Sequence, residues 1–320
     1  MVLKKNSTPI RINMITGMPT KDDFYSTASH MVNEAWESVC ELGFPYNKFL
    51  MENSLRKKHN LELIDLNSYW AYASPKLISA FSLVQQSVEF RLKGIICDIS
   101  PYLLISNSVT SPPKKVNGRI NFGDFYTLDA KDLLKVIDTF TNVKLDDGFA
   151  TKFNMMRALR NSFMHSVNYN GGVTFESIID LICYMHKNLN PKDPDWFVYR
   201  YNYMVTHSSN GIDLSKEYLK GWEYKPAAEY VEMFNVHVEF NTVINLLSPE
   251  LTREHFNFIK NPNKKRSYEC VSCSEKLDRS QRVHAKNDDD FFIGRYTVQA
   301  TKEFPKIGVC AICKKNQSIK

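Results

Sequence analysis

The residues best suited to chemistry lie close together, between Arg157 and His165. If this stretch is an α-helix, its side chains follow one another at about 100°, and Arg157, Asn161 and His165 then share one polar face. Arg160 lies at the border of that face, and its long side chain can swing onto it. An arginine offers a rigid fork of donors to a phosphate, and a histidine can move a proton near neutral pH. The stretch therefore predicts a site for a phosphate-bearing ligand.

The opposite face of this predicted helix, which covers residues 149–167, is apolar. We expect it to face the core through Met155, Met156, Leu159 and Phe163. A structural role for the histidine is the alternative. A lone histidine on a helix more often serves packing than catalysis, and an arginine followed five residues later by a histidine arises easily by chance.

A second helix, predicted over residues 76–99, has the same division into two sides. Its polar side includes Glu89 and Lys93, and Ser100-Pro101 ends it. Its apolar side consists of Leu77, Phe81, Val84, Val88, Leu92 and Ile95. The second helix therefore offers a polar stripe that matches the one on residues 149–167, with Glu89 available either to a catalytic group or to a simple ion pair with a neighbour.

Four of the seven cysteines form two C-x-x-C pairs, Cys270 with Cys273 and Cys310 with Cys313. In a cytosolic chain this spacing predicts a metal site rather than disulfides. Four thiolates suit a tetrahedral Zn²⁺, and they leave no position open for water, so we expect the zinc to be structural. The alternative is two pairs that arose by chance. The other cysteines, Cys40, Cys97 and Cys183, are predicted to be small core residues.

Composition sets broad limits on the class of protein. The 320 residues carry a net charge of +6, with 43% hydrophobic and 24% charged residues. A mild positive charge fits an anionic partner such as nucleic acid without requiring one. No run approaches the roughly 18 apolar residues of a membrane span, and the N-terminus lacks the apolar segment of a secretory signal. We expect a cytoplasmic protein with no membrane partner. The nucleotide-binding and serine-hydrolase motifs are absent from the sequence.

The remaining pattern predicts an antiparallel helical bundle over residues 21–189. A helix over 21–42 is expected to stop at Gly43, with Pro45 just beyond. Asp129 should cap a helix over 130–141 that buries Phe140, and Thr174 should cap one over 174–189. Further helices are predicted over 47–60 and 223–247, and strands between the cysteine pairs. The aromatic run 196–203 predicts a strand or a packed lid. It could stack on bases, but packing against the bundle is favoured.

The stretch from Arg160 to His165 resembles the R-x4-6-H signature of the HEPN domain family, including the polar residue that the family favours after the arginine. The stretch from Leu83 to Lys93 is similar to the long early helix of that family. The resemblance covers roughly residues 60–190. It implies a mainly α fold, an antiparallel HEPN-like bundle followed by a small β-rich zinc ribbon. The expected parts are an N-terminal helical extension (1–59), the bundle (60–190), an aromatic and helical connection (191–260) and the zinc ribbon (261–320).

The resemblance also implies an activity, a metal-independent endoribonuclease of the toxin or anti-phage type. Arg160, Asn161 and His165 would be catalytic, and Glu89 would hold one of them. RNA, which could be tRNA, would be bound by Arg157, Lys93, Lys264, Lys265 and Arg266, although such a basic run is usually only solvated.

Partners follow from the same resemblance. A homodimer through the bundle is expected, with Phe153 and Met164 at the contact. An antitoxin or a trigger protein would restrain the nuclease. The alternative function is a non-catalytic HEPN-like module that binds RNA or protein, with the zinc ribbon doing the recognition. A weaker third possibility is a transcription-related zinc-ribbon protein with an unrelated helical bundle.

Overall fold

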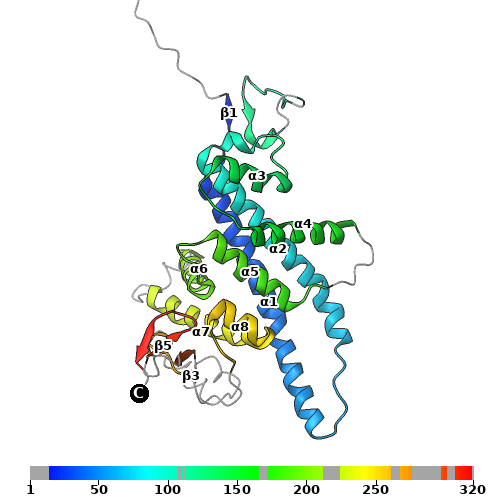
Figure 1. Ribbon diagram of the computed structural model, residues 1–320, viewed down its shortest axis with the longest axis vertical. Helices are drawn as coiled ribbons and strands as arrows, with labels where there is room; N and C mark the ends of the chain where they lie inside the picture. The colour runs from blue at the N-terminus through cyan, green and yellow to red at the C-terminus, as the bar shows by residue number, and fades with distance from the viewer. Residues whose placement is uncertain are drawn as a thin grey trace, which may run out of the picture. The chain divides into compact units, whose positions relative to one another are not determined.

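The structure is a computed structural model, and it describes residues 14–106, 110, 112–165, 172–211, 224–260, 267–275, 297–300 and 307–318. The chain is mainly α-helical with a small sheet at its C-terminal end (Figure 1), which confirms this part of the predicted fold. It divides into two units. The first comprises residues 1–30 and 85–159, and the second comprises residues 31–84 and 160–320.

The first unit contains parts of two long helices, the beginning of one and the end of the other. Its helices are the first part of α1 (Lys21–Lys58), the second part of α2 (Asn67–Ile99), α3 (Ala130–Phe140) and most of α4 (Asp147–His165). A short parallel pair, β1 (Ile15–Thr16) with β2 (Ile120–Asn121), and the 3-10 helices η1 (Pro101–Leu104) and η2 (Phe122–Asp124) complete it. Aromatic packing holds α1 to α2, since the ring centroids of Phe24 and Phe90 are 5.8 Å apart.

The second unit contains the other parts of α1 and α2 and all of the C-terminal helices. These are α5 (Phe175–Leu189), α6 (Trp196–Gly211), α7 (Tyr224–Leu246) and α8 (Pro249–Phe256). An antiparallel sheet follows, in the order β3 (Ser267–Tyr268), β4 (Val298–Ala300), β5 (Ile307–Cys310) and β6 (Asn316–Ser318), with the short helix α9 (Val271–Ser274) after β3. The predicted strands between the cysteine pairs are therefore present.

The expected helix stop at Gly43 and Pro45 is wrong, because α1 continues through both residues. A proline inside a helix removes one backbone hydrogen bond and costs about 3 kcal/mol. Contacts with α7 on both sides of it oppose that cost. A Cβ added at Gly43 would lie 2.5 Å from Cδ1 of Leu246, so the glycine allows a close approach. Nδ2 of Asn47 donates to the backbone oxygen of Thr242 at 2.9 Å.

The second long helix also starts earlier than predicted, at Asn67 rather than near residue 76, and it contains Pro75. The early turns are held by aromatic contacts within the second unit, where the ring of Tyr46 lies 5.4 Å from Tyr69 and 5.1 Å from Trp70. The predicted apolar stripe is buried from Leu77 to Leu92. The predicted end of the helix at Ser100 is confirmed.

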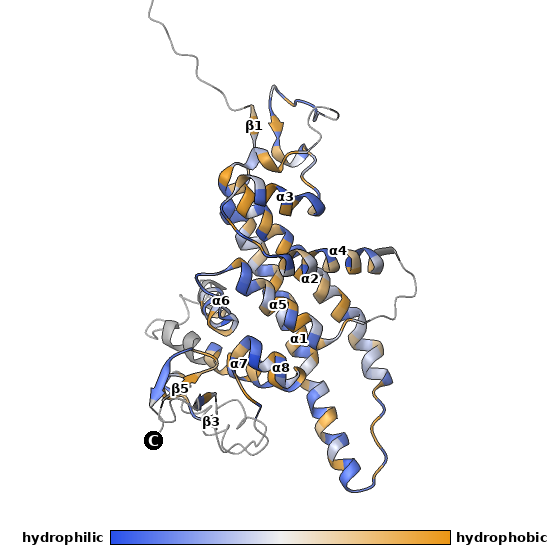
Figure 2. Ribbon diagram, viewed as in Figure 1, coloured by the Kyte–Doolittle hydropathy of each residue, from blue (hydrophilic) through white to orange (hydrophobic). Residues whose placement is uncertain are grey.

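Two helix caps test the sequence predictions in detail. Asp129 occupies the N-cap position of α3, but its side chain makes no capping hydrogen bond, and Phe140 is 52% exposed rather than buried. Thr174 caps α5 as predicted and forms a capping box with Ser177. Hydrophobic residues recur along α5 (Figure 2), and the helix buries Ile178, Ile179, Leu181, Ile182 and Met185.

The aromatic run 196–203 is helical, as part of α6, so the predicted strand is wrong. Trp196 and Phe197 are buried, and both rings contact Trp36. The preferred interpretation, packing rather than base stacking, is therefore confirmed for these two residues. Within the described ranges, no helix combines the length and the apolar character needed to cross a membrane.

Candidate functional site

Helix α4 forms as predicted, but its buried face differs from the predicted one. Phe149, Phe153 and Met156 are fully buried, whereas Met155 is 45% exposed. These buried positions follow the helical repeat of i, i+4 and i+7. The expected dimer contact of Phe153 is wrong, because this side chain is in the core. The expected core position of Met155 is also wrong, because this side chain is exposed.

The predicted catalytic residues lie on the last turns of α4. Arg160 is half-buried and follows Phe153 and Met156 by whole turns, so it continues the buried line of the helix. Asn161 is exposed. His165 is the last residue of α4, and its side chain, like that of Met164, lies outside the described part of the structure.

Glu89 has partners of its own on α2. Its Oε1 forms an ion pair with Nζ of Lys93 at 2.8 Å, and Nε2 of Gln85 donates to its Oε2 at 3.4 Å. The side chains of Glu89 and Lys93 are 19% and 12% exposed, so this pair is largely sheltered from solvent. Glu89 belongs to the first unit and His165 to the second. A catalytic role for Glu89 and RNA binding by Lys93 stay predictions.

The other predicted RNA contacts are less defined. Arg157 is half-exposed, and its Nη1 donates to Oδ1 of Asn154 at 3.1 Å on the same helix. The basic run of Lys264, Lys265 and Arg266 lies outside the described residues. RNA binding by all four residues stays a prediction.

The predicted cysteine cluster is the most compact site in the described ranges. The sulfur atoms of Cys270, Cys273, Cys310 and Cys313 all lie within 4.8 Å of one another. The Sγ atoms of Cys270 and Cys313 are 3.6 Å apart, and those of Cys273 and Cys310 are 3.9 Å apart. These separations are far beyond a disulfide bond of about 2.05 Å, and all four thiols are free. The cluster could hold one metal ion.

Two local structures aim the sulfurs at one point. Cys270 is the N-cap residue of α9, so Cys270 and Cys273 lie on one helical turn. Cys310 ends β5 at a tight turn, where the backbone N–H groups of Ile312 and Cys313 donate to Sγ of Cys310 at 3.4 and 3.5 Å. Lys314 takes a left-handed conformation with φ of 57° and lets the chain return as β6.

Further hydrogen bonds divide the protons unequally among the thiols. Hydrogen bonds from Cys270, Cys273 and Cys313 lower the pKa of the Cys310 thiol. Hydrogen bonding with Cys270 raises the pKa of Cys273. The hydroxyl of Thr297 is 3.1 Å from Sγ of Cys310 and also favours its thiolate. Thiolate is the form that binds a metal ion, so Cys310 is already favoured as a ligand, whereas Cys273 would have to lose its proton when an ion binds.

Sequence analysis missed a buried ion network centred on Arg200 of α6. The arginine side chain is 1% exposed. Its Nη2 contacts Oε1 of Glu239 and Oε1 of Glu37, each at 2.8 Å, and Nη1 donates to Asn33 at 2.8 Å. Nε1 of Trp36 donates to the other oxygen of Glu239 at 2.8 Å. Burial opposes the charge of Arg200, but Glu239 and Glu37 raise its pKa, so the guanidinium stays protonated.

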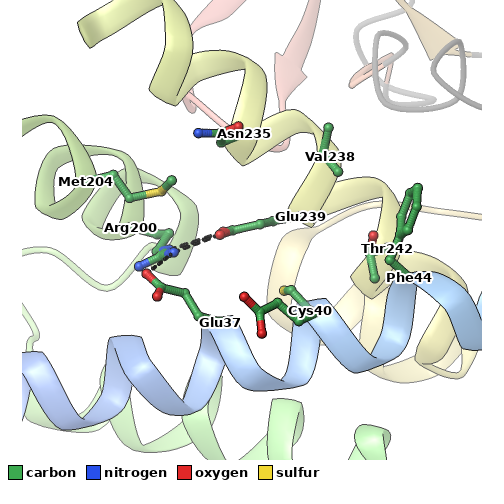
Figure 3. A pocket seen from close by; sticks show the side chains of 10 residues that line it. Glu37, Cys40, Phe44, Arg200, Met204, Asn235, Val238, Glu239 and Thr242 are labelled. Carbon is green, nitrogen blue, oxygen red and sulfur yellow. Dashed lines mark hydrogen bonds and ion pairs between the residues drawn. The ribbon is translucent and has the colours of Figure 1, made fainter. Parts of the chain in front are cut away.

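This network forms one wall of an open cleft of about 490 Å³ between α1, α6 and α7 (Figure 3). The lining of the cleft combines charged and apolar side chains. Glu37 and Glu41 are acidic, and Cys40, Met204 and Val238 are apolar. Burial raises the pKa of the Cys40 thiol, which fits its predicted role as a small core residue. The only signal in the sequence was an arginine within an apolar and aromatic run.

The fold and the cysteine cluster define a mainly helical protein with a C-terminal candidate metal centre. Comparison with protein-family models, with curated proteins and with solved structures found no match.

Proposed function

We propose that this protein is an endoribonuclease of the HEPN type with a structural zinc site. One observation carries the proposal. Arg160, Asn161 and His165 fall on the last turns of a well-formed helix, with Asn161 exposed and Arg160 only half-buried. The motif thus lies on a helix, and the amide of Asn161 is open to a ligand. The HEPN resemblance supplies the class of reaction, and the residue types supply the chemistry.

RNA carries its own nucleophile, the ribose 2′-hydroxyl. His165 would take the proton of that hydroxyl as a general base, or would protonate the leaving 5′-oxygen as a general acid. The 2′-oxygen forms a bond to phosphorus and the bond to the 5′-oxygen breaks, which yields a 2′,3′-cyclic phosphate and a 5′-hydroxyl. Arg160 would stabilise the extra negative charge on the phosphorane. Asn161 would orient the phosphate or the imidazole.

The HEPN resemblance adds a second copy of the chain, with the two motifs of Arg160 and His165 facing each other across a cleft. We therefore propose a homodimer in which His165 of a second copy takes the other proton-transfer role. The sheltered pair of Glu89 with Lys93 supports a structural role for Glu89.

The cysteine cluster supports the zinc part of the proposal. Tetrahedral Zn²⁺ with Zn–S bonds of about 2.3 Å sets its sulfurs about 3.8 Å apart. The two observed separations of 3.6 and 3.9 Å lie on either side of this value. The residues therefore fit the ion. Four sulfurs leave no site for a catalytic water, so the zinc would stabilise the small sheet and take no part in cleavage.

Arg160 is half-buried and continues the buried face of α4. This position favours a second candidate function, a non-catalytic HEPN-like module that binds RNA or protein. In that case Arg160 would serve packing, and the zinc ribbon would do the recognition. Expression in bacteria separates the two candidates. The ribonuclease should be toxic, and His165→Ala should relieve the toxicity without lowering the amount of folded protein. Equal tolerance of the wild type and the variant would favour the non-catalytic module.

A chemically modified substrate tests the mechanism itself. An RNA with a single 2′-deoxyribose at the cleaved position should resist cleavage there, because its nucleophile is missing. Cleavage at that position would exclude attack by the 2′-hydroxyl. The same RNA serves as its own control, because its other cleavage sites should remain sensitive.

A further inference from the structure

The C-terminal half of α1 carries an exposed apolar stripe. Phe44, Met51 and Leu55 are 37%, 48% and 50% exposed. Their spacing of i, i+7 and i+11 places them on one side of the helix. Three large apolar side chains in a line on an exposed helix are typical of a surface that packs against another helix. We name this the α1 stripe.

Charged residues of opposite sign lie at the two ends of the α1 stripe. Glu37 and Glu41 lie at its N-terminal end, and Lys58 lies at its C-terminal end. Glu41 and Lys58 are exposed, and neither side chain forms an ion pair or a hydrogen bond with any part of the chain that the structure describes. Lys48, in the middle, directs its ammonium over the ring of Phe44, 4.7 Å from the centroid.

The α1 stripe is complementary to itself when two copies run antiparallel. If a two-fold axis crosses α1 just before Lys48, Phe44 faces Met51 of the second copy, and Glu37 faces Lys58 of the second copy. Each of these pairs is equally far from the axis along the sequence. A parallel arrangement would instead set carboxylate against carboxylate. We propose that the α1 stripe is an isologous docking surface for a second copy of this chain.

The cleft between α1, α6 and α7 lies where this arrangement needs space (Figure 3). In the same register, Leu55 of the second copy falls opposite Cys40, which lines the cleft. Lys58 of the second copy then comes beside Glu37 and Glu41. Glu37 already pairs with Arg200 at 2.8 Å, so Glu41 is the carboxylate of the two that Lys58 of the second copy would neutralise. The cleft can therefore receive the C-terminal end of the α1 stripe of the second copy, with Leu55 against its apolar lining and Lys58 against its carboxylates.

The size of the α1 stripe sets the strength of the contact. From Glu37 to Lys58 the helix extends about 33 Å at 1.5 Å per residue. A single pair of helices with only a few apolar contacts is smaller than a standard stable interface. We therefore expect a reversible dimer that dissociates in the micromolar range. The inference does not rest on the proposed ribonuclease activity, since a non-catalytic protein would dimerise in the same way.

Sedimentation equilibrium on the full chain tests the inference. The wild type should associate to a dimer, and Met51→Glu should weaken the dimer at least 10-fold, since a two-fold axis places the new charge in the interface twice. Leu61→Glu is the matched control, because Leu61 is 56% exposed and lies outside the stripe. Its dimer should match the wild type. A wild type that stays monomeric up to about 200 µM overturns the inference, because even a weak specific interface should then be populated.

Charge reversal tests the antiparallel register. Lys58→Glu should weaken the dimer, because it sets a carboxylate against Glu37 and Glu41 of the second copy. Adding Glu41→Lys to that variant should restore part of the lost affinity. Both residues are exposed, so neither change should disturb the fold, which circular dichroism verifies. A double variant that is weaker than Lys58→Glu alone would contradict the register and with it the proposed surface.

Discussion

The cysteine cluster and the end of α4 were both predicted as sites from short sequence spacings. They differ in how completely the structure brings their residues together. At the cysteine cluster, residues up to 43 positions apart bring four sulfurs within 4.8 Å of one another. At the end of α4, the residues are neighbours in sequence, yet the helix leaves Arg160 half-buried and Asn161 exposed. The first site is complete within one chain. The second depends on what approaches it, so it should be important for activity and unimportant for stability.

The largest effect should come from the cysteine cluster. Cys310→Ser should abolish metal binding and unfold the C-terminal sheet, because zinc supplies about 10–16 kcal/mol to such small segments. Metal analysis and hydrogen exchange of β4, β5 and β6 measure both losses. Cys183→Ala, which changes a buried thiol outside the cluster, should keep the metal. A Cys310→Ser protein with a full metal content and a protected sheet would show that the cluster is not a metal site.

The next effect should come from Arg200, which sharpens the contrast between a structural and a functional arginine. Arg200→Met leaves the carboxylate of Glu239 buried without its cationic partner, and should lower the free energy of unfolding by about 3–5 kcal/mol. Urea denaturation measures the loss. Arg157→Met, a half-exposed arginine on α4, is the control and should change stability by less than about 0.5 kcal/mol. Equal effects of the two substitutions would refute a structural role for the Arg200 network.

A smaller effect on stability is expected at Arg160. Its side chain is half-buried, and Arg160→Met should cost less than about 1 kcal/mol. The same variant should lose RNA cleavage by about 100-fold or more, since a transition-state donor is worth that much. A variant that is strongly destabilised but cleaves normally when folded would assign Arg160 to the core. The end of α4 would then serve stability, as the cysteine cluster does.

The smallest combined effect on stability and cleavage should come from Glu89. Replacing it by glutamine removes an i, i+4 ion pair with Lys93. Because this pair is largely sheltered, the cost should exceed that of an exposed pair and reach about 1 kcal/mol. Cleavage should stay unchanged if the pair is only structural. A large loss of cleavage with the expected small loss of stability would instead support the catalytic role that was predicted for Glu89.

The sequence was informative where local chemistry decides the structure. The cysteine spacings, the Thr174 cap and the buried stripe of α2 could be predicted, because each depends on neighbouring residues. The prediction failed where tertiary contacts outweigh local preference. Pro45 should end a helix, but the close packing of Gly43 and Asn47 against α7 carries α1 past it.

The Arg200 network shows the same limit for the site. Its partners Asn33 and Glu37 lie more than 160 positions earlier in the chain, and its third partner, Glu239, lies 39 positions later. No pattern in the sequence links residues at these distances. The face of α4 was also misassigned, because Phe149 and Phe153 were not counted among its core positions. Only the fold shows which side of such a helix is covered.

The cleavage of RNA by the folded protein tests the central claim most directly. Wild type and His165→Ala should be incubated with total RNA and with tRNA, with and without brief treatment with EDTA, and the product ends analysed. We predict that the wild type cuts in both conditions and leaves a 2′,3′-cyclic phosphate, and that His165→Ala does not cut. Cleavage that persists in His165→Ala would contradict the assignment of this site.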